Sequence, residues 1–168
     1  VASVAGHALK PTVLELGGAD PFIVMPSADL SHAVEAAVVG RTINNGQSCI
    51  AAKRFIVHSD VYDEFTDRFV SAFENLKVGD PTSDATDIGP LAMAKIRDDI
   101  DEQVIHSTAL GAKILTGAEP MSGQGYFYRP GILAQIPESA PAYAEEVFGP
   151  VAMLFRVSNL DEAIKVSN

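Results

Sequence analysis

The apolar positions of this chain follow two alternating patterns, one typical of strands and one typical of helices. Short apolar runs rich in β-branched and aromatic residues cover 12–16, 21–25, 55–57, 113–116, 131–136 and 151–157. Apolar residues recur at helical spacing over 30–38, 61–76 and 96–110. Turn-forming residues end two of these helical runs, at Asn44–Gly46 and at Gly111. Strands that alternate with helices predict an α/β domain with a largely parallel sheet flanked by helices.

Three further patterns indicate structure and not chemistry. The most strongly amphipathic helical run carries the aromatic stripe Phe65, Phe69 and Phe73, which we interpret as core packing. The glycine-rich segment 117–125 lacks the Lys and Ser/Thr of a phosphate-binding loop and opens no helix, which favours a surface loop. Ser158–Asp161 has the form of a capping box and predicts the start of a helix.

Composition and charge narrow the function classes. The 168 residues, 47% of them hydrophobic and 20% charged, suffice for one globular domain with its own core. The formal net charge of −10 argues against nucleic acid and anionic membranes as partners. No apolar run approaches the roughly 20 residues that span a bilayer. A single cysteine cannot form an internal disulfide, which fits the reducing conditions of a cytoplasmic protein.

The candidate chemistry lies in turns. The single cysteine, Cys49, follows Asn44–Ser48 and therefore lies beyond the end of a predicted helix, outside its apolar stripe. Glu15 precedes Gly17–Gly18, so we expect it at the end of a strand beside a tight turn. A thiol and a carboxylate on turns suit a nucleophile and a general base. Further along the chain, Glu145–Pro150 combines an acidic pair, an aromatic residue and a turn.

Each of these residues also has a purely structural interpretation. A lone cysteine is most often a small buried hydrophobe, and a glutamate before two glycines is most often a solvated charge at a strand end. For the later segment, the alternative is an acidic pair beside a helix and a phenylalanine of the core. No metal site is predicted, because none of the four histidines has metal-ligand spacing to another or lies near the cysteine. These histidines are His7, His32, His58 and His106.

The chain resembles the catalytic part of the aldehyde dehydrogenase superfamily nearly from end to end. Three segments carry the resemblance at family-like spacing, namely Leu14–Gly18, Gly46–Cys49 and Glu145–Pro150. Within the superfamily, Asp20–Val24 and Cys49–Phe55 are most similar to bacterial succinate-semialdehyde dehydrogenases. The resemblance implies an oxidoreductase with the aldehyde dehydrogenase fold and NAD(P) as its cofactor.

The resemblance also implies roles for individual residues. Cys49 would be the nucleophile that forms a thiohemiacetal and then a thioester, and Glu15 the base that activates water for hydrolysis. The backbone N–H of Cys49 would donate to the oxyanion. Glu146 would hold the nicotinamide ribose hydroxyls, Phe148 would pack near the nicotinamide ring, and Leu16 would lie on the cofactor side. We expect Glu146 at the surface, where its substitution changes stability little.

The resemblance favours succinic semialdehyde, a small aldehyde that is oxidised to succinate. Some relatives carry an arginine six positions before the nucleophile to bind the substrate carboxylate. Here that position is Ile43, and Arg41 would point elsewhere on a helix. The alternatives are another semialdehyde or aliphatic aldehyde dehydrogenase, a phosphorylating relative, and a non-catalytic scaffold domain. Glu15 favours hydrolysis over transfer to phosphate or coenzyme A, and the choice between NAD and NADP stays open.

The two ends of the chain predict a fragment of a longer enzyme. It begins at Val1 without an initiator methionine and stops at Asn168 within a helical pattern. We therefore interpret residues 1–168 as the nucleophile-bearing catalytic domain, with the dinucleotide-binding domain absent from it. By resemblance, the second oxyanion donor would be an asparagine in that absent part, and the complete enzyme would be a homo-oligomer. The isolated fragment is then expected to be inactive.

Overall fold

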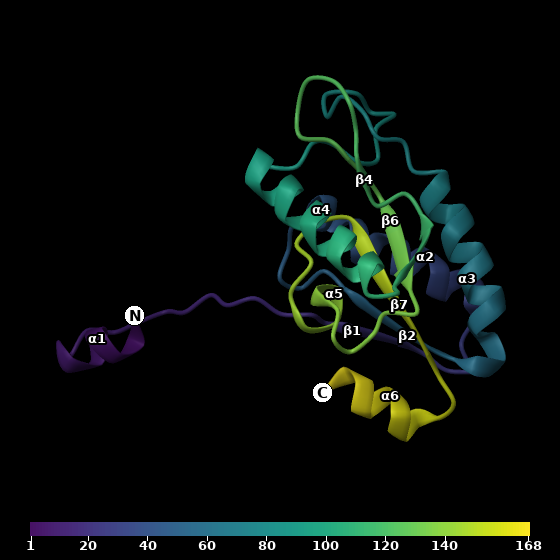
Figure 1. Ribbon diagram of the computed structural model, residues 1–168, viewed down its shortest axis with the longest axis horizontal. Helices are drawn as coiled ribbons and strands as arrows, with labels where there is room; N and C mark the ends of the chain where they lie inside the picture. The colour runs from purple at the N-terminus through teal and green to yellow at the C-terminus, as the bar shows by residue number, and fades with distance from the viewer.

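The chain folds around a five-stranded sheet, which the computed structural model describes together with the rest of residues 1–168 (Figure 1). In spatial order the strands are β1 (Pro21–Val24), β2 (Arg54–His58), β7 (Val151–Val157), β6 (Gly131–Ala134) and β3 (Lys113–Thr116). The first four run parallel, and β3 pairs antiparallel with β6 at one edge. A separate ribbon joins β4 (Glu119–Pro120) to β5 (Tyr128–Arg129). The predicted α/β fold with a largely parallel sheet is confirmed.

Helices cover both faces of this sheet (Figure 1). The helices of the chain are α1 (Ala2–His7), which lies away from the sheet, α2 (Leu30–Thr42), α3 (Ser59–Glu74), α4 (Ala94–Ala109), α5 (Pro141–Ala144) and α6 (Leu160–Ser167), and a 3₁₀ turn occupies Ile43–Gly46. The side chains of α2 and α3 pack on one face of the sheet, and those of α4, α5 and α6 pack on the other. The three helices predicted from periodicity correspond to α2, α3 and α4. None of the helices combines the length and the apolarity needed to cross a bilayer.

The central strands are buried on both faces, so the core has two halves. On the α2–α3 face, the ring of Phe55 lies 4.9 Å from that of Phe69, which lies 4.7 Å from the ring of Phe73. The aromatic stripe of α3 is thus part of the core, as its spacing predicts. On the opposite face, Ile100 and Val104 of α4 pack against alternate strand residues. The sheet is held rigidly between two apolar layers.

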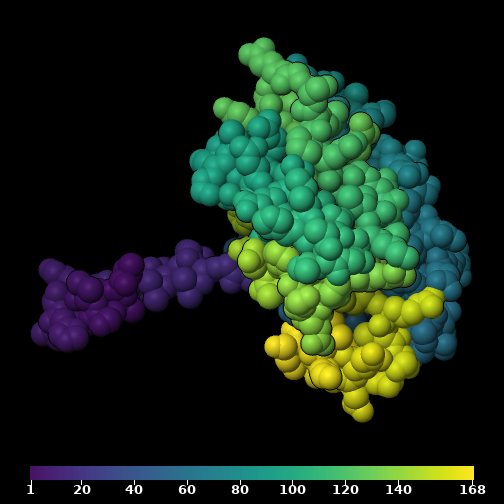
Figure 2. All heavy atoms as spheres, viewed as in Figure 1, coloured from purple at the N-terminus to yellow at the C-terminus, as the bar shows by residue number.

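The N-terminal segment differs from the prediction. Residues 10–20 form neither helix nor strand, and with α1 they extend away from the body as an arm (Figures 1 and 2). The strand expected at 12–16 is therefore wrong for this structure. No strand of the sheet lies beside these residues to pair with their backbone groups. Glu15 consequently lies in the extended arm and not at the end of a strand.

The start of α6 differs from the prediction by one residue. The helix follows the capping box as expected, but Asn159 is the N-cap and not Ser158. The Asn159 side chain accepts the Glu162 N–H at 2.9 Å, and the Glu162 carboxylate accepts the Ser158 N–H at 2.7 Å. This backbone bond is the main reason why the pKa of Glu162 is lowered. Reciprocal capping therefore fixes where α6 begins.

We predict that Phe69→Ala destabilises the fold by about 3–5 kcal/mol, because it removes a ring that contacts three other buried rings and leaves a cavity. Val39→Ala on the exposed side of α2 serves as the control and should change stability by less than about 0.5 kcal/mol. Urea unfolding followed by circular dichroism measures both values. Equal unfolding midpoints for the two variants would contradict the assignment of Phe69 to the core.

Candidate functional site

Three turns meet at one edge of the sheet. Residues 14–18 precede β1, residues 46–49 precede β2 and residues 145–150 precede β7. Because these strands are neighbours and run parallel, their N-terminal ends lie side by side. A backbone bond from the Lys53 N–H to the Asp20 carbonyl, 3.0 Å long, joins two of these ends directly. The topology therefore gathers motifs that are far apart in the sequence.

Two glycines allow these turns to approach one another closely. Gly46 has a φ of +75°, and a Cβ at this position would overlap the carbonyl group of Gly149. A Cβ on Gly17 would overlap the Glu146 carboxylate oxygen Oε2. The Gly46 contact joins the turn at 46–49 to the turn at 145–150, and the Gly17 contact joins residues 14–18 to the same turn at 145–150. A larger residue at either position would push the turns apart.

Cys49 lies on an exposed turn that follows two asparagines in the left-handed backbone conformation. The 3₁₀ turn after α2 holds Asn44 at a φ of 51° and Asn45 at a φ of 56°, a region that asparagine tolerates better than most residues. The Asn45 side chain anchors this turn to a distant loop. It donates to the Pro90 carbonyl at 3.2 Å and accepts the Gly89 N–H at 3.1 Å. The free thiol of Cys49 is thereby presented at the surface.

A fully buried cation lies beneath the Cys49 turn. Lys53 is 0% exposed, and its Nζ donates to the carbonyl oxygens of Ser48, Cys49 and Ala51 at 3.1, 3.0 and 3.1 Å. The same Nζ lies 3.1 Å from Glu146 Oε1. Burial of an ammonium is costly unless the charge is paired and hydrogen bonded, and Lys53 has both kinds of partner. The turn that carries Cys49 and the turn that carries Glu146 therefore both contact the ammonium group of Lys53.

A second buried cation supports the start of the same turn. Arg41 is 0% exposed, and its Nη2 donates to the Gly46 carbonyl at 2.7 Å, whereas Nε and Nη1 have no hydrogen-bond partner. Burial lowers the pKa of Arg41 to about 10, and the nearby charge of Glu146 opposes this shift. Arg41 therefore remains charged at neutral pH. It lies inside the protein, whereas Ile43 is 48% exposed.

Glu146 departs from the prediction of a surface carboxylate. Its side chain is only 22% exposed, because it pairs with the buried Lys53. The three N–H donors of Lys53 are hydrogen bonded to three carbonyl oxygens. Glu146 Oε1 is therefore attracted to the ammonium by charge alone and accepts no hydrogen bond from it. Because of this pairing, we now expect a change of Glu146 to affect stability. Its Oε1 remains able to accept a hydrogen bond from another group.

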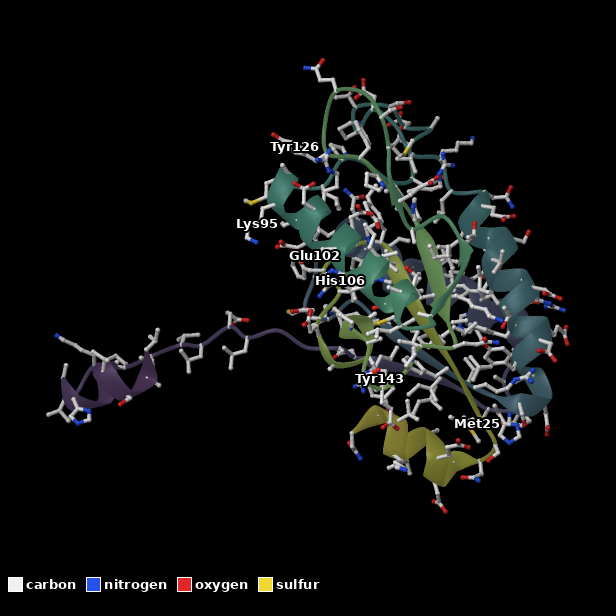
Figure 3. All side chains as sticks on the ribbon, in the orientation of Figure 1. Met25, Lys95, Glu102, His106, Tyr126 and Tyr143 are labelled. Carbon is white, nitrogen blue, oxygen red and sulfur yellow. The ribbon has the colours of Figure 1, made fainter.

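Glu146 and Phe148 border a pocket of about 410 Å³ between α4 and the turn before β7. The other walls are Ile96, Asp99, Ile100, Glu102, Gln103, His106, Pro141 and Glu145. Figure 3 labels two of these residues, Glu102 and His106, which project from α4. Glu145 accepts a hydrogen bond from Gln103 at 2.9 Å and faces solvent. The pocket therefore combines one aromatic wall with several acceptors.

Glu15 and Leu16 lie apart from this centre. Both are exposed on the N-terminal arm, and Glu15 forms no hydrogen bond or ion pair within the chain. The carboxylate of Glu15 therefore lies in solvent and not at the strand end that its sequence position predicts. Only Gly17 of this motif reaches the centre, through its contact with Glu146. The structure joins the Cys49 turn to Glu146 and leaves the Glu15 carboxylate in solvent.

Neither buried cation, Lys53 or Arg41, is predicted by the sequence patterns described above. The sequence around Lys53 indicates burial, because this residue lies between two alanines, Ala51 and Ala52, and the apolar run of a buried strand. Arg41 gave a weaker signal, as a cation in the last turn of a helix whose buried face includes it. Buried charges need partners, and neither set of carbonyl partners can be identified from spacing alone.

Arg54, next in the chain, fixes a different part of the site. Its Nε donates to the Ala19 carbonyl at 2.7 Å, and its two terminal nitrogens donate to the Val166 and Ser167 carbonyls at 2.8 Å each. The guanidinium thus caps the C-terminal end of α6 and holds the chain just before β1. The root of the N-terminal arm is anchored, although the arm itself is exposed.

The comparisons with known proteins agree with this geometry. Residues 1–168 match the model of the aldehyde dehydrogenase family. A succinate-semialdehyde dehydrogenase (NADP(+)) of Mycobacterium avium (strain 104) is 57% identical over all 168 residues, which correspond to 36% of its length. The chain therefore spans about a third of the length of the curated relatives that it matches.

Solved structures give the same result. The 3,6-anhydro-L-galactose dehydrogenase in complex with NAP is 35% identical with a TM-score of 0.94, over 99% of this chain and 36% of that one. The succinate-semialdehyde dehydrogenase of Burkholderia pseudomallei is 36% identical with a TM-score of 0.93, over 99% of this chain and 34% of that one. Since the family match covers every residue and these folds superpose closely, the chain belongs to the aldehyde dehydrogenase family.

Proposed function

We propose that this chain is the nucleophile-bearing segment of an NADP-dependent dehydrogenase that oxidises succinic semialdehyde to succinate. The observation that carries the proposal is the exposed Cys49 thiol on a turn whose carbonyls are held from below by Lys53. The names of the similar proteins support the substrate, and the NADP(+) in the name of the mycobacterial relative favours NADP over NAD. The dinucleotide-binding domain would then lie outside residues 1–168.

The residues near the pocket fit a nicotinamide dinucleotide. Glu146 Oε1 is buried without a hydrogen-bond donor, and a ribose diol offers two donors to such an oxygen. Phe148 supplies an apolar face beside it for a flat ring. When bound, the dinucleotide would accept the hydride that leaves the substrate. In this arrangement Glu146 binds the ribose and Phe148 limits the movement of the ring, and Leu16, which is exposed on the arm, is accessible to the cofactor.

The first part of the reaction belongs to Cys49. Its thiolate attacks the aldehyde carbon, a C–S bond forms, and the carbonyl electron pair moves onto oxygen to give a tetrahedral thiohemiacetal. The backbone N–H of Cys49 donates to this oxyanion. When the electron pair returns to form the carbonyl, hydride leaves the carbon and a thioester to Cys49 remains. The substrate carbon is thereby oxidised by two electrons.

The second part of the reaction needs a base. Glu15 takes a proton from water, the water oxygen attacks the thioester carbon, and the C–S bond breaks to release the carboxylic acid and the Cys49 thiolate. In this structure Glu15 is exposed on the arm. The surroundings that would desolvate its carboxylate belong to the rest of the proposed enzyme.

The substrate carboxylate has no receptor at the position where some relatives carry arginine. Ile43 occupies that position, and Arg41 is buried and donates to the Gly46 carbonyl. This observation favours one second candidate, a dehydrogenase of the same family for another semialdehyde or an aliphatic aldehyde. We further propose a homo-oligomer in the cytoplasm, where reducing conditions preserve the free thiol. A substrate panel run with NAD and with NADP on the full-length enzyme decides among these aldehydes.

The isolated 168-residue chain should produce no NADPH from succinic semialdehyde at a useful rate. It would lack the dinucleotide-binding domain and the second oxyanion donor, and loss of one such donor alone lowers the rate by about 10²–10³-fold. Absorbance at the NADPH band, with the full-length enzyme as the positive control, measures the rate. Turnover by the isolated chain equal to that of the full-length enzyme would refute the proposed domain division.

In the full-length enzyme, Cys49→Ala should abolish dehydrogenase activity, whereas Glu15→Gln should slow thioester hydrolysis and keep a burst of NADPH. The reason is that attack and hydrolysis use different groups. Rapid mixing resolves the burst from the steady state. An unchanged steady-state rate in Glu15→Gln would remove Glu15 from the role of base, and an active Cys49→Ala would favour a different nucleophile.

Glu146→Gln should lower single-turnover NADPH formation by about 10²-fold, because the ribose loses a charged acceptor and the ring is displaced. It should also lower the free energy of unfolding by about 1–3 kcal/mol, since the buried Lys53 loses its carboxylate. The exposed Glu138 gives a matched control, Glu138→Gln, which should change neither quantity, because this carboxylate lies outside the pocket. Reduced stability with normal hydride transfer would show that Glu146 is purely structural.

A further inference from the structure

The orientation of the Cys49 turn depends on a single side chain. Lys53 draws three carbonyl oxygens of the turn, from Ser48, Cys49 and Ala51, toward one point inside the protein. Each of its three N–H donors has one of these acceptors, and the side chain has no contact with solvent. Such convergence of carbonyls within four residues is not part of any helix or strand in this chain. The ammonium therefore determines the peptide orientations of this turn.

A fixed carbonyl also fixes the N–H group of the same peptide unit. In a planar trans peptide, the C=O and the N–H point in opposite directions. The Ser48 carbonyl points at Lys53, so the Cys49 N–H points away from it. The Cys49 carbonyl points at Lys53 as well, so the Ile50 N–H also points away. Neither N–H donates to any backbone or side-chain acceptor of the chain, so two adjacent donors are left free.

The charges around the turn favour an anion on that free side. Two fully buried cations, Lys53 and Arg41, lie close to only one carboxylate, that of Glu146. The local excess of positive charge is enclosed in the protein, where electrostatic interactions are stronger than in water. A negative charge that develops on an oxygen beside Cys49 would be stabilised by this excess and by the free N–H group of Cys49.

From these contacts we infer that Lys53 is a positioning residue for the reaction. It holds the N–H group of Cys49 as a preformed donor for the substrate oxyanion, and it holds Glu146 at a fixed distance from the same turn. The inference rests on the proposed function, since it needs an oxyanion next to Cys49. Lys53 contacts neither substrate nor cofactor and acts through the backbone that it orients.

The test compares two replacements of equal length in the full-length enzyme. Lys53→Met removes every donor, whereas Lys53→Gln keeps two N–H donors that can hold two of the three carbonyls. Lys113→Met is the control, because Lys113 is exposed on β3 and has no ion pair or hydrogen bond through its side chain. The measurements are kcat and KM for succinic semialdehyde, thermal unfolding, and the rate of Cys49 alkylation by iodoacetamide. Alkylation needs an accessible thiol but no oxyanion donor.

Lys53→Met should lower kcat by about 10²–10³-fold, the size of an oxyanion-donor loss. The KM and the alkylation rate per folded molecule should stay within about threefold of wild type. Lys53→Gln should recover at least about tenfold in kcat by restoring donors, and Lys113→Met should match wild type. A kcat within threefold of wild type in Lys53→Met would overturn the inference. Parallel losses of kcat, alkylation and folded protein would also overturn it, because a purely structural residue behaves in that way.

If Lys53→Met fails to fold, Lys53→Gln decides the question. A folded Lys53→Gln with normal alkylation and a kcat lowered at least about tenfold supports positioning. A normal kcat, or failure to fold in this variant too, refutes it. The wild-type enzyme separates this inference from the proposed function. If its Cys49 is alkylated but no aldehyde yields NADPH, the proposed function has failed, and the role of Lys53 fails with it for lack of an oxyanion.

Discussion

Parallel pairing of β1, β2 and β7 is the constraint on which the rest of this structure depends. It aligns the N-terminal ends of three strands whose preceding turns are separated by most of the chain. The apolar layers on both faces hold that alignment, and glycines at 46 and 17 let the turns touch. The topology therefore places Cys49 and Glu146 at the amino ends of parallel strands, where turns enter the sheet. The fold brings the turns close together, and their side chains determine which contacts they form.

Once the turns are together, buried charge determines their detailed geometry. Lys53 donates hydrogen bonds to the carbonyls of the Cys49 turn and forms an ion pair with Glu146 in the other turn. One residue therefore binds both turns, through two kinds of interaction. Arg41 repeats part of this arrangement at the Gly46 carbonyl. A buried cation with many neutral partners is sensitive to their positions, because each lost partner leaves part of its desolvation uncompensated. The peptide groups of the Cys49 turn are therefore held in place by hydrogen bonds, whereas the Cys49 thiol is exposed to solvent.

Much of the fold could be predicted from periodicity and turn residues. The aromatic spacing of α3, the stop at Asn44–Gly46 and the alternation of strands with helices all have local causes. The strand expected at 12–16 does not form, because a strand requires a partner that spacing cannot supply. The same limit applies to the site. Motifs pointed to Cys49 and Glu146, but the carbonyls that surround Lys53 converge only through tertiary structure, and a local pattern could not place Glu146 inside.

The clamp formed by Arg54 has a consequence for the order of folding. Its three hydrogen bonds join residues separated by 35, 112 and 113 positions along the chain. Closing such long loops carries a large entropic penalty, so contacts of this kind form after the local helices and the aromatic core. Docking of α6 and anchoring of Ala19 then become one late event. The amino edge of the sheet is completed only when nearly the whole segment has folded.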